Sequence, residues 1–169
     1  MKTQLHPGAK WLFRIGGYFF FGILGIFFGI WIIAPLAGLL VNLVGISGNL
    51  VVAIVLLSVM GYILFVIVAS EIYARMSYTR WLYEFTDEGL RLERGIIWKR
   101  YSNVPYERIQ NVDVHRGIIA RMFGFSSLMI QTAGYSAQPY AEGYIPAVEM
   151  SQAEQIRTFV MKKITSGRK

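Results

Sequence analysis

Residues 15–40 read IGGYFFFGILGIFFGIWIIAPLAGLL, and residues 50–70 read LVVAIVLLSVMGYILFVIVAS. Both belong to a run of 56 residues, 15–70, that contains no Asp, Glu, Lys or Arg. One bilayer span needs about 20 apolar residues, so this run is long enough for two spans and a turn. Residues 41–49 are rich in the turn formers Asn, Gly and Ser. Because helices satisfy their own backbone in hydrocarbon, we predict a two-helix transmembrane hairpin over 15–70.

One part of the chain precedes this apolar run, and two parts follow it. Residues 1–14 form a basic N-terminal flank, 71–80 a juxtamembrane connector and 81–166 a globular domain. The apolar region of a signal peptide has about 7–15 residues, so the first segment is too long for a typical cleaved signal. The net charge is +7, and Lys and Arg flank both spans while the turn has no charge. Since cytoplasmic flanks collect Lys and Arg, we predict that both termini are cytoplasmic.

Aromatic and cationic side chains near the span ends are candidates for contact with lipid headgroups. These are Trp11, Arg14, Tyr73, Arg75, Tyr78, Arg80 and Trp81. Only about ten residues separate the second span from the first predicted strand, and as a helix they cover about 15 Å. We therefore predict a domain held close to the bilayer.

Glycines in the first span fall on one helix face. Gly22, Gly25 and Gly29 are spaced three and four residues apart, which favours a close helix–helix contact. That contact lies within the hairpin or between copies; alternatively, the glycines reflect only the frequency of glycine in membrane helices. Pro35 is predicted to kink or end the first helix.

The globular part alternates apolar and polar residues, which is typical of strands. Strands are predicted at 81–86, 90–94, 96–101, 109–115, 127–132 and 144–148, with a turn at Asp87-Glu88-Gly89. Residues 117–124 are predicted to be a short helix or turn that plugs the sheet structure; the alternative is an exposed patch. Ser151-Gln152-Ala153-Glu154 resembles a capping box, followed by an amphipathic helix that frays from Thr165.

The segment YEFTDEGLRLERGIIWKRYSNVPYERIQNVDVHRGIIARMFGFSSLMIQTAG resembles the bacterial pleckstrin-homology (PH) domain family, in its membrane-anchored form. The pieces that carry the likeness are Gly95-Ile96-Ile97, Pro105 with residues 108–112, Arg121-x-Phe-Gly124 and residues 130–134. The resemblance implies a bent antiparallel barrel of about seven strands, capped by the C-terminal helix. It also implies a bacterial inner-membrane location. Eukaryotic relatives bind phosphoinositides through a basic first hairpin loop, whereas the corresponding loop here, 86–89, is acidic.

Catalytic and cofactor motifs are missing from the sequence. There is no cysteine, which excludes disulfides, thiol catalysis and cysteine-based metal sites. His6 and His115 are isolated, and no nucleophile elbow, P-loop or dinucleotide motif is present. We therefore expect no enzyme activity, no cofactor, no metal and no small-molecule substrate.

The basic charge gives the main indication of a partner. Residues 71–169 carry 14 Lys and Arg against 10 Asp and Glu, and no nucleic-acid motif accompanies them. Anionic lipid headgroups therefore fit better than nucleic acid. The cations of interest are Arg75, Arg80, Lys99, Arg100, Arg108, Arg116 and Arg121, and residues 133–143 form a candidate binding loop of unspecified ligand.

Two functional hypotheses follow from these observations. The first is a non-enzymatic membrane protein that presents its domain for protein assembly, by self-association or with a homologous membrane partner. The second is an accessory subunit of a membrane enzyme or transporter whose chemistry lies in another chain.

Overall fold

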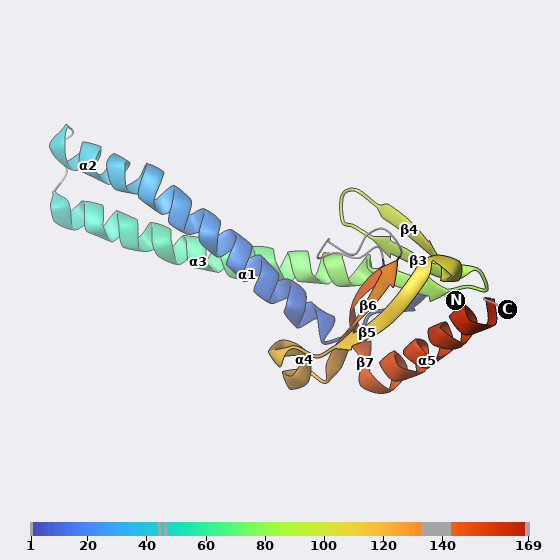
Figure 1. Ribbon diagram of the computed structural model, residues 1–169. Helices are drawn as coiled ribbons and strands as arrows, with labels where there is room; N and C mark the ends of the chain where they lie inside the picture. The colour runs from blue at the N-terminus through green and yellow to red at the C-terminus, as the bar shows by residue number, and fades with distance from the viewer. Residues whose placement is uncertain (1, 44, 46, 133–142, 168–169) are drawn as a thin grey trace. The chain divides into compact units, whose positions relative to one another are not determined.

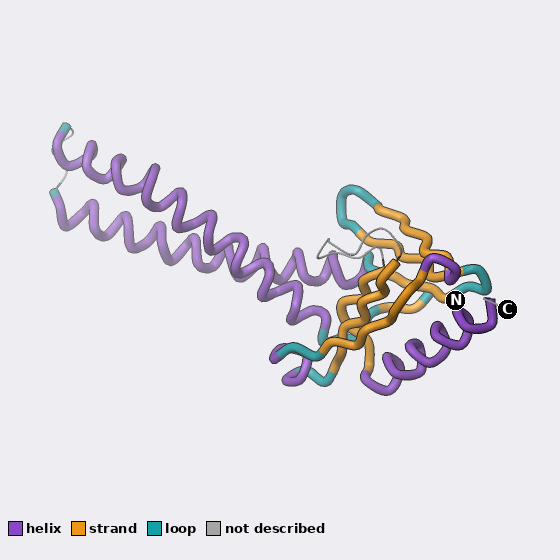
Figure 2. The backbone as a smooth tube through the Cα atoms, viewed as in Figure 1, coloured by secondary structure: helices purple, strands orange, loops and turns teal. Residues whose placement is uncertain are grey.

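The computed structural model describes residues 2–43, 45, 47–132 and 143–167. In this part of the chain there are two compact units: Met1–Leu12 with Arg75–Lys169, and Phe13–Ala74. The first unit is the mainly β domain and the second is the helical hairpin (Figures 1 and 2). The N-terminal residues therefore belong to the domain, although about sixty residues of hairpin separate them from the rest of it in the sequence.

The hairpin is built from the predicted apolar segments. Helix α1 (Ala9–Phe28) continues through η1 (Gly29–Ile33), a π-helical turn, into α2 (Ala34–Asn42), and α3 covers Gly48–Thr79. The helices Ala9–Asn42 and Gly48–Thr79 are each long and apolar enough to cross a membrane. Most of their large apolar side chains are exposed to the surroundings of the chain, as expected for a surface that faces lipid rather than water. Two long apolar helices before the domain are thus confirmed.

Pro35 does not end the first helix. It occupies the first turn of α2, directly after the π-helical turn Gly29–Ile33, where the Ala34 amide donates to the Gly29 carbonyl. A proline removes one backbone donor and its ring crowds the carbonyl four residues earlier. The wider turn gives room for that ring, so the helix continues beyond it.

The domain contains two antiparallel sheets in its described residues. One has the order β1 (Thr3–Gln4), β2 (Leu82–Phe85), β3 (Gly89–Arg94) and β4 (Arg100–Pro105). The other has the order β5 (Ile109–His115), β6 (Phe125–Thr132) and β7 (Gly143–Glu149). The turn η2 (Tyr106–Arg108) joins the sheets, α4 (Ile118–Met122) lies between β5 and β6, and α5 (Met150–Gly167) follows β7. Among the described residues no ladder joins the two sheets, so they do not form the closed barrel that the sequence resemblance implied.

The core lies between the sheets and α5. Alternate strand residues point inward because successive side chains of a strand face opposite sides. On α5, Ala153, Val160 and Ile164 are buried at helical spacing, and Phe159 makes edge-on ring contacts with Phe85 and Tyr106. Buried strand side chains include Tyr83, Leu90, Leu92, Val104, Ile109, Val112, Phe125, Leu128, Ile130, Ile145 and Val148. The amphipathic helix therefore packs mainly on the three-stranded sheet and reaches the four-stranded sheet through Phe85 (Figure 1).

The N-terminal segment completes the domain in a way that the sequence did not indicate. Thr3 and Gln4 pair with Tyr83 and Leu82, so β1 extends the four-stranded sheet. The His6 amide donates to the Ala147 carbonyl at 3.0 Å, and Leu5 is buried. This short segment consequently contacts both sheets.

Three local predictions need correction. Residues 96–99 are a loop rather than a strand, and β4 begins at Arg100, because Gly95 has a φ of 119° and turns the chain. Helix α5 begins at Met150, so Ser151 lies in its first turn and does not cap it, and the helix continues to Gly167. The remaining strands and the turn at Asp87-Glu88 match the prediction within a few residues.

Candidate membrane interface

The two ends of strand β3 differ in chemistry. The turn before β3 contains Asp87 and Glu88, whereas the β3–β4 loop after it, Gly95–Lys99, is followed by Arg100. From Arg94 to Tyr101 the chain has three cations and no acid. The domain is therefore acidic at one end of the four-stranded sheet and basic at the other.

The β3–β4 loop exposes two large apolar side chains at this basic end. Ile97 is 84% exposed and Trp98 is 87% exposed, and Tyr101 at the start of β4 is also exposed. Scattered exposed apolar residues are ordinary, but a contiguous apolar group indicates an interaction site. An exposed Ile–Trp pair beside cations has the composition of a membrane-interface segment.

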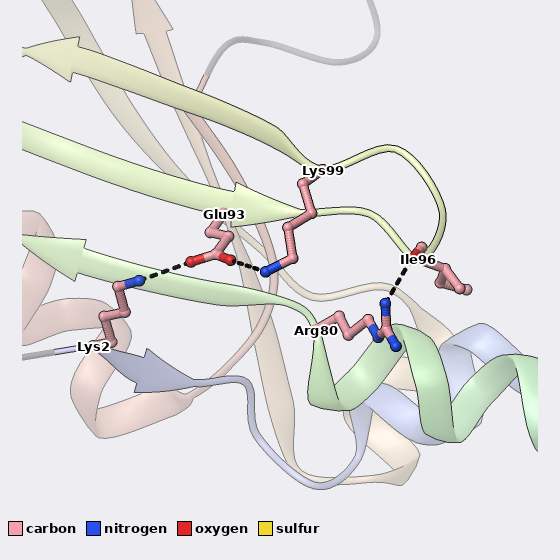
Figure 3. Close-up of polar contacts among 5 residues, drawn as sticks. All are labelled: Lys2, Arg80, Glu93, Ile96 and Lys99. Carbon is pink, nitrogen blue, oxygen red and sulfur yellow. Dashed lines mark hydrogen bonds and ion pairs between the residues drawn. The ribbon is translucent and has the colours of Figure 1, made fainter.

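Hydrogen bonds hold this loop from two sides. Arg80, directly after α3, donates from Nη1 to the Ile96 carbonyl at 2.7 Å, and Lys99 donates from Nζ to Glu93 Oε1 at 3.0 Å. Figure 3 shows both contacts and the third member of the cluster, Lys2, which donates to Glu93 Oε2 at 2.8 Å. Glu93 thus joins the N-terminal segment, β3 and the loop.

The two lysines change the acidity of Glu93. Hydrogen bonds from Lys2 and then Lys99 favour the carboxylate, and together they lower the pKa of Glu93 to about 2. The same carboxylate raises the pKa of both lysines. The cluster is therefore fully ionised at neutral pH.

Helix α4 forms a second exposed apolar group. Ile118 is 70% exposed and Met122 73% exposed, while Ala120 is buried. The predicted short helix is confirmed, but Ile118 and Met122 do not plug the core, because both are exposed. Phe123, after α4, stacks on Trp11 of α1 with ring centroids 5.1 Å apart. These contacts attach α4 to the first turn of α1.

Comparison with known proteins identifies the family. The family described as Bacterial PH domain matches residues 12–164. The chain belongs to the bacterial PH domain family. It is 28% identical over 104 residues to the UPF0699 transmembrane protein YdbT of Bacillus subtilis (strain 168), which is 62% of this chain and 20% of that protein. It is 26% identical over 96 residues to the UPF0699 transmembrane protein YdbS of the same organism, covering 57% of each. The chain thus matches about a fifth and just over half of the lengths of these relatives, and no solved structure matches it significantly.

The candidate headgroup residues of this bacterial PH domain protein occupy different environments. Tyr73 is exposed, and Trp11 is partly exposed beside Phe123. Tyr78 lies beneath the ammonium of Lys10, 4.7 Å from the ring centre. Trp81 is only 7% exposed and packs inside the domain, so it does not reach a lipid surface. Trp81 directly precedes β2 and lies two residues before buried Tyr83. Since alternate strand residues face the same side, Trp81 is directed toward the core.

Arg14 is engaged within the hairpin. It donates to both carboxylate oxygens of Glu71, from Nε at 2.5 Å and from Nη2 at 2.9 Å. The pair joins the early part of α1 to the late part of α3. Bidentate hydrogen bonds between an arginine and a carboxylate are strong and directional. Arg75 lies in the last turns of α3, where the Thr79 hydroxyl donates to its carbonyl at 3.0 Å.

The three glycines of the first span have different surroundings. A Cβ on Gly25 would collide with the ring of Tyr62, whereas a Cβ on Gly22 or Gly29 would meet nothing within 4 Å. The Tyr62 hydroxyl donates to the Phe21 carbonyl at 2.6 Å. Gly25 therefore contacts the second helix of the hairpin, while Gly22 and Gly29 leave open space beside it.

Metal-binding clusters and grooves were the remaining features through which the bacterial PH domain could act on a small ligand. In residues 2–43, 45, 47–132 and 143–167 there is no group of three or more His, Cys, Asp and Glu side chains that could hold a metal ion. A groove of about 360 Å³ lies on the four-stranded sheet, and the Lys2–Glu93 pair forms part of its wall. The candidate binding loop at 133–143 lies outside the described residues except for Gly143.

Sequence reasoning missed the most exposed residues of the interface. Ile97 and Trp98 were predicted as part of a strand, where one of the two would face the core. The available signal was Gly95 directly before an Ile-Ile-Trp-Lys-Arg segment, since glycine favours a turn and apolar residues next to cations favour an interface.

Proposed function

We propose that this chain is a non-enzymatic inner-membrane protein that presents its bacterial PH domain for protein assembly beside anionic lipid. The observation that carries the proposal is the basic end of the domain, where exposed Ile97 and Trp98 accompany cations. A cation near an anionic membrane surface contributes about 1 kcal/mol of attraction. The chain also contains two helices long enough to span a bilayer, which supports a lipid surface as the place of action.

The orientation follows from charge asymmetry. Lys2, Lys10 and Arg14 precede the first span, Arg75 and Arg80 follow the second, and residues 41–49 have no charge. The positive-inside rule then favours a hairpin whose turn is outside and whose termini and domain are in the cytoplasm.

The hairpin offers a surface for the assembly itself. Gly22 and Gly29 border an apolar groove of about 550 Å³ between α1 and α3, which also includes Ser58 and Tyr62. Small residues permit close approach of another helix. Self-association or pairing with a homologous membrane partner is the assembly that this surface supports.

The second candidate is an accessory subunit of a membrane enzyme or transporter complex. It is favoured by the transmembrane relatives YdbT and YdbS, of which this chain matches only part. In that case the partner chain supplies the chemistry, and the bacterial PH domain positions it.

Purification of the tagged full chain from membranes in mild detergent distinguishes these candidates. Native mass spectrometry of the eluate is expected to show a homo-oligomer or a stoichiometric homologous membrane protein. A stoichiometric catalytic or channel-forming partner would instead favour the accessory-subunit candidate. A monomer without any stoichiometric partner contradicts both. Gly22→Leu, which fills the open groove, is expected to reduce the oligomer, and Gly16→Leu is a control at another glycine of α1 that has no neighbour within 4 Å.

A further inference from the structure

Strands β3 and β4 place two arginines opposite each other at the base of the exposed loop. Arg94 and Arg100 are register partners in the ladder, and Arg100 is exposed. Like charges directly opposite each other in a sheet are unfavourable. An anion bound between or beside them would remove that repulsion, and the two guanidinium groups are well suited to phosphate.

The apolar tip of the same loop lies beyond this pair. Ile97 and Trp98 are almost fully exposed, and tryptophan favours the boundary between headgroups and hydrocarbon. A ligand that satisfies both features must offer an anionic phosphate and an apolar layer next to it. A phospholipid surface has both.

The loop is also prepared for such a contact. Arg80 holds Ile96 at one side of the loop and Glu93 holds Lys99 at the other, as Figure 3 shows. A loop that is already ordered loses little conformational entropy on binding. Ile97 and Trp98, between these two anchors, are consequently directed outward without a change of fold.

Contacts inside the domain indicate which end of it carries the loop. Arg80, which bonds Ile96, comes directly after α3, and Trp11 of α1 stacks on Phe123 next to α4. Within the domain, Ile96 of the loop thus contacts Arg80, and Phe123 next to α4 contacts Trp11.

We propose that the β3–β4 loop inserts Ile97 and Trp98 into an anionic lipid surface while Arg94 and Arg100 bind a headgroup phosphate. The proposal rests on the proposed function in one respect, that the domain works beside a membrane. It adds the contact itself, the two inserted side chains and the phosphate-binding pair.

The test uses the full chain, which contains no cysteine, so a single introduced cysteine can carry a nitroxide label. The label is placed at Ile97→Cys, and at Glu88→Cys, on the acidic turn, as the control. Each protein is reconstituted in nanodiscs of phosphatidylcholine alone or mixed with phosphatidylglycerol. Power saturation then compares collisions of the label with oxygen, which concentrates in hydrocarbon, and with a water-soluble nickel chelate.

At position 97 the label is expected to collide more often with oxygen than with the nickel chelate in the anionic nanodiscs. When Arg100→Gln is added, its collisions with the nickel chelate are expected to increase. At position 88 it is expected to favour the nickel chelate in both lipids, with or without that substitution. An unchanged thermal unfolding midpoint shows that the variants are folded. A label at 97 that behaves like the one at 88 in anionic nanodiscs overturns the proposal.

Two further readings identify other occupants of the loop. Spin–spin broadening at position 97 would show that a second copy covers the loop, which also overturns insertion. Inorganic phosphate added to phosphatidylcholine nanodiscs tests whether a free anion binds the arginine pair. If phosphate alone protected the label from collisions with the nickel chelate, the pair would be assigned to a soluble ligand, which contradicts the lipid contact. Native mass spectrometry of the same samples reports assembly separately, so failure of insertion is distinguishable from failure of the proposed function.

Discussion

Glu93 is the residue on which the arrangement of the basic end depends most directly. Its carboxylate binds Lys2 of the N-terminal segment and Lys99 of the β3–β4 loop. Both lysines are more than half exposed, whereas the Glu93 side chain is 13% exposed. Exposed ion pairs contribute little individually, so the main effect expected of this cluster is to help order the N-terminal segment and the β3–β4 loop beside their other contacts.

The first prediction concerns Glu93→Gln and pH. The pKa of Glu93 in the folded chain is about 2, below its ordinary value of 4.5, so the ionised cluster stabilises the fold above about pH 4.5. That stabilisation is lost as the pH falls toward 2. Glu93→Gln is expected to lower the unfolding midpoint at pH 7 and to weaken its dependence between pH 5 and pH 3, measured by circular dichroism in detergent. Glu88→Gln, at an exposed turn residue, is the control, and parallel pH curves for wild type and Glu93→Gln would contradict the assignment.

At the scale of elements, the hairpin depends on how α1 and α3 meet. Gly25 lies against the ring of Tyr62, and the hydroxyl of that tyrosine reaches the Phe21 carbonyl on α1. Gly17 similarly lies against Ser70. Small residues therefore permit close approach at two levels of the helix pair, and the Arg14–Glu71 pair adds a polar contact near its end.

The second prediction is that Gly25→Ala weakens the hairpin and Gly22→Ala does not. The added methyl group at position 25 forces the Tyr62 ring away and breaks its hydrogen bond, and overpacking of this kind costs about 1–3 kcal/mol. At position 22 the methyl group enters open space. Denaturant titration in detergent micelles, followed by helical circular dichroism, measures the difference. Equal loss of stability in the two variants would contradict the assignment of Gly25, and not Gly22, to the contact with Tyr62.

At the scale of the whole molecule, the domain is assembled from both ends of the chain. Strand β1 and Leu5 precede the hairpin, whereas the remaining strands follow it. Gly8 lies close to Phe125, since a Cβ on this glycine would come within 2.6 Å of the Phe125 ring. A fragment that begins at Arg80 therefore lacks part of its own core and sheet.

The third prediction follows from this assembly. Leu5→Ala in the full chain is expected to destabilise the domain by about 2–5 kcal/mol, the usual cost of removing a buried leucine. Leu43→Ala, at an exposed leucine, is expected to have little effect. Denaturant titration followed by tryptophan fluorescence measures both, and a Leu5→Ala chain as stable as the wild type would contradict the role of the N-terminal segment.

The fourth prediction concerns topology. A cysteine at Ser47, in the hairpin turn, is expected to react with a membrane-impermeant maleimide in intact cells, whereas a cysteine at Glu88 is expected to react only after lysis. Ser126 is unsuitable as the domain site, because its side chain is buried. The reverse labelling pattern would place the domain outside and overturn the orientation inferred from the basic flanks.

The sequence by itself determined the elements whose signal is local. An uncharged run of 56 residues admits little other than apolar helices, and the alternation from Leu82 to Arg94 produces a hairpin because strand side chains face opposite sides in turn. The spacing of Ala153, Val160 and Ile164 likewise predicted the buried face of α5. Each of these patterns repeats over neighbouring residues, so no distant contact is needed to read it.

Only the tertiary structure decided the contacts between distant residues. The pairing of Thr3 with Tyr83 joins backbones about eighty residues apart, and two residues are too few to show a periodic pattern. The rotation of α1 against α3 selects Gly25, rather than Gly22 or Gly29, as the glycine that meets Tyr62. Trp81 and Trp98 have similar aromatic and basic neighbours in the sequence, yet one is buried and the other exposed. The physical reason is that burial depends on which surfaces the folded backbone brings together, and local composition does not contain that information.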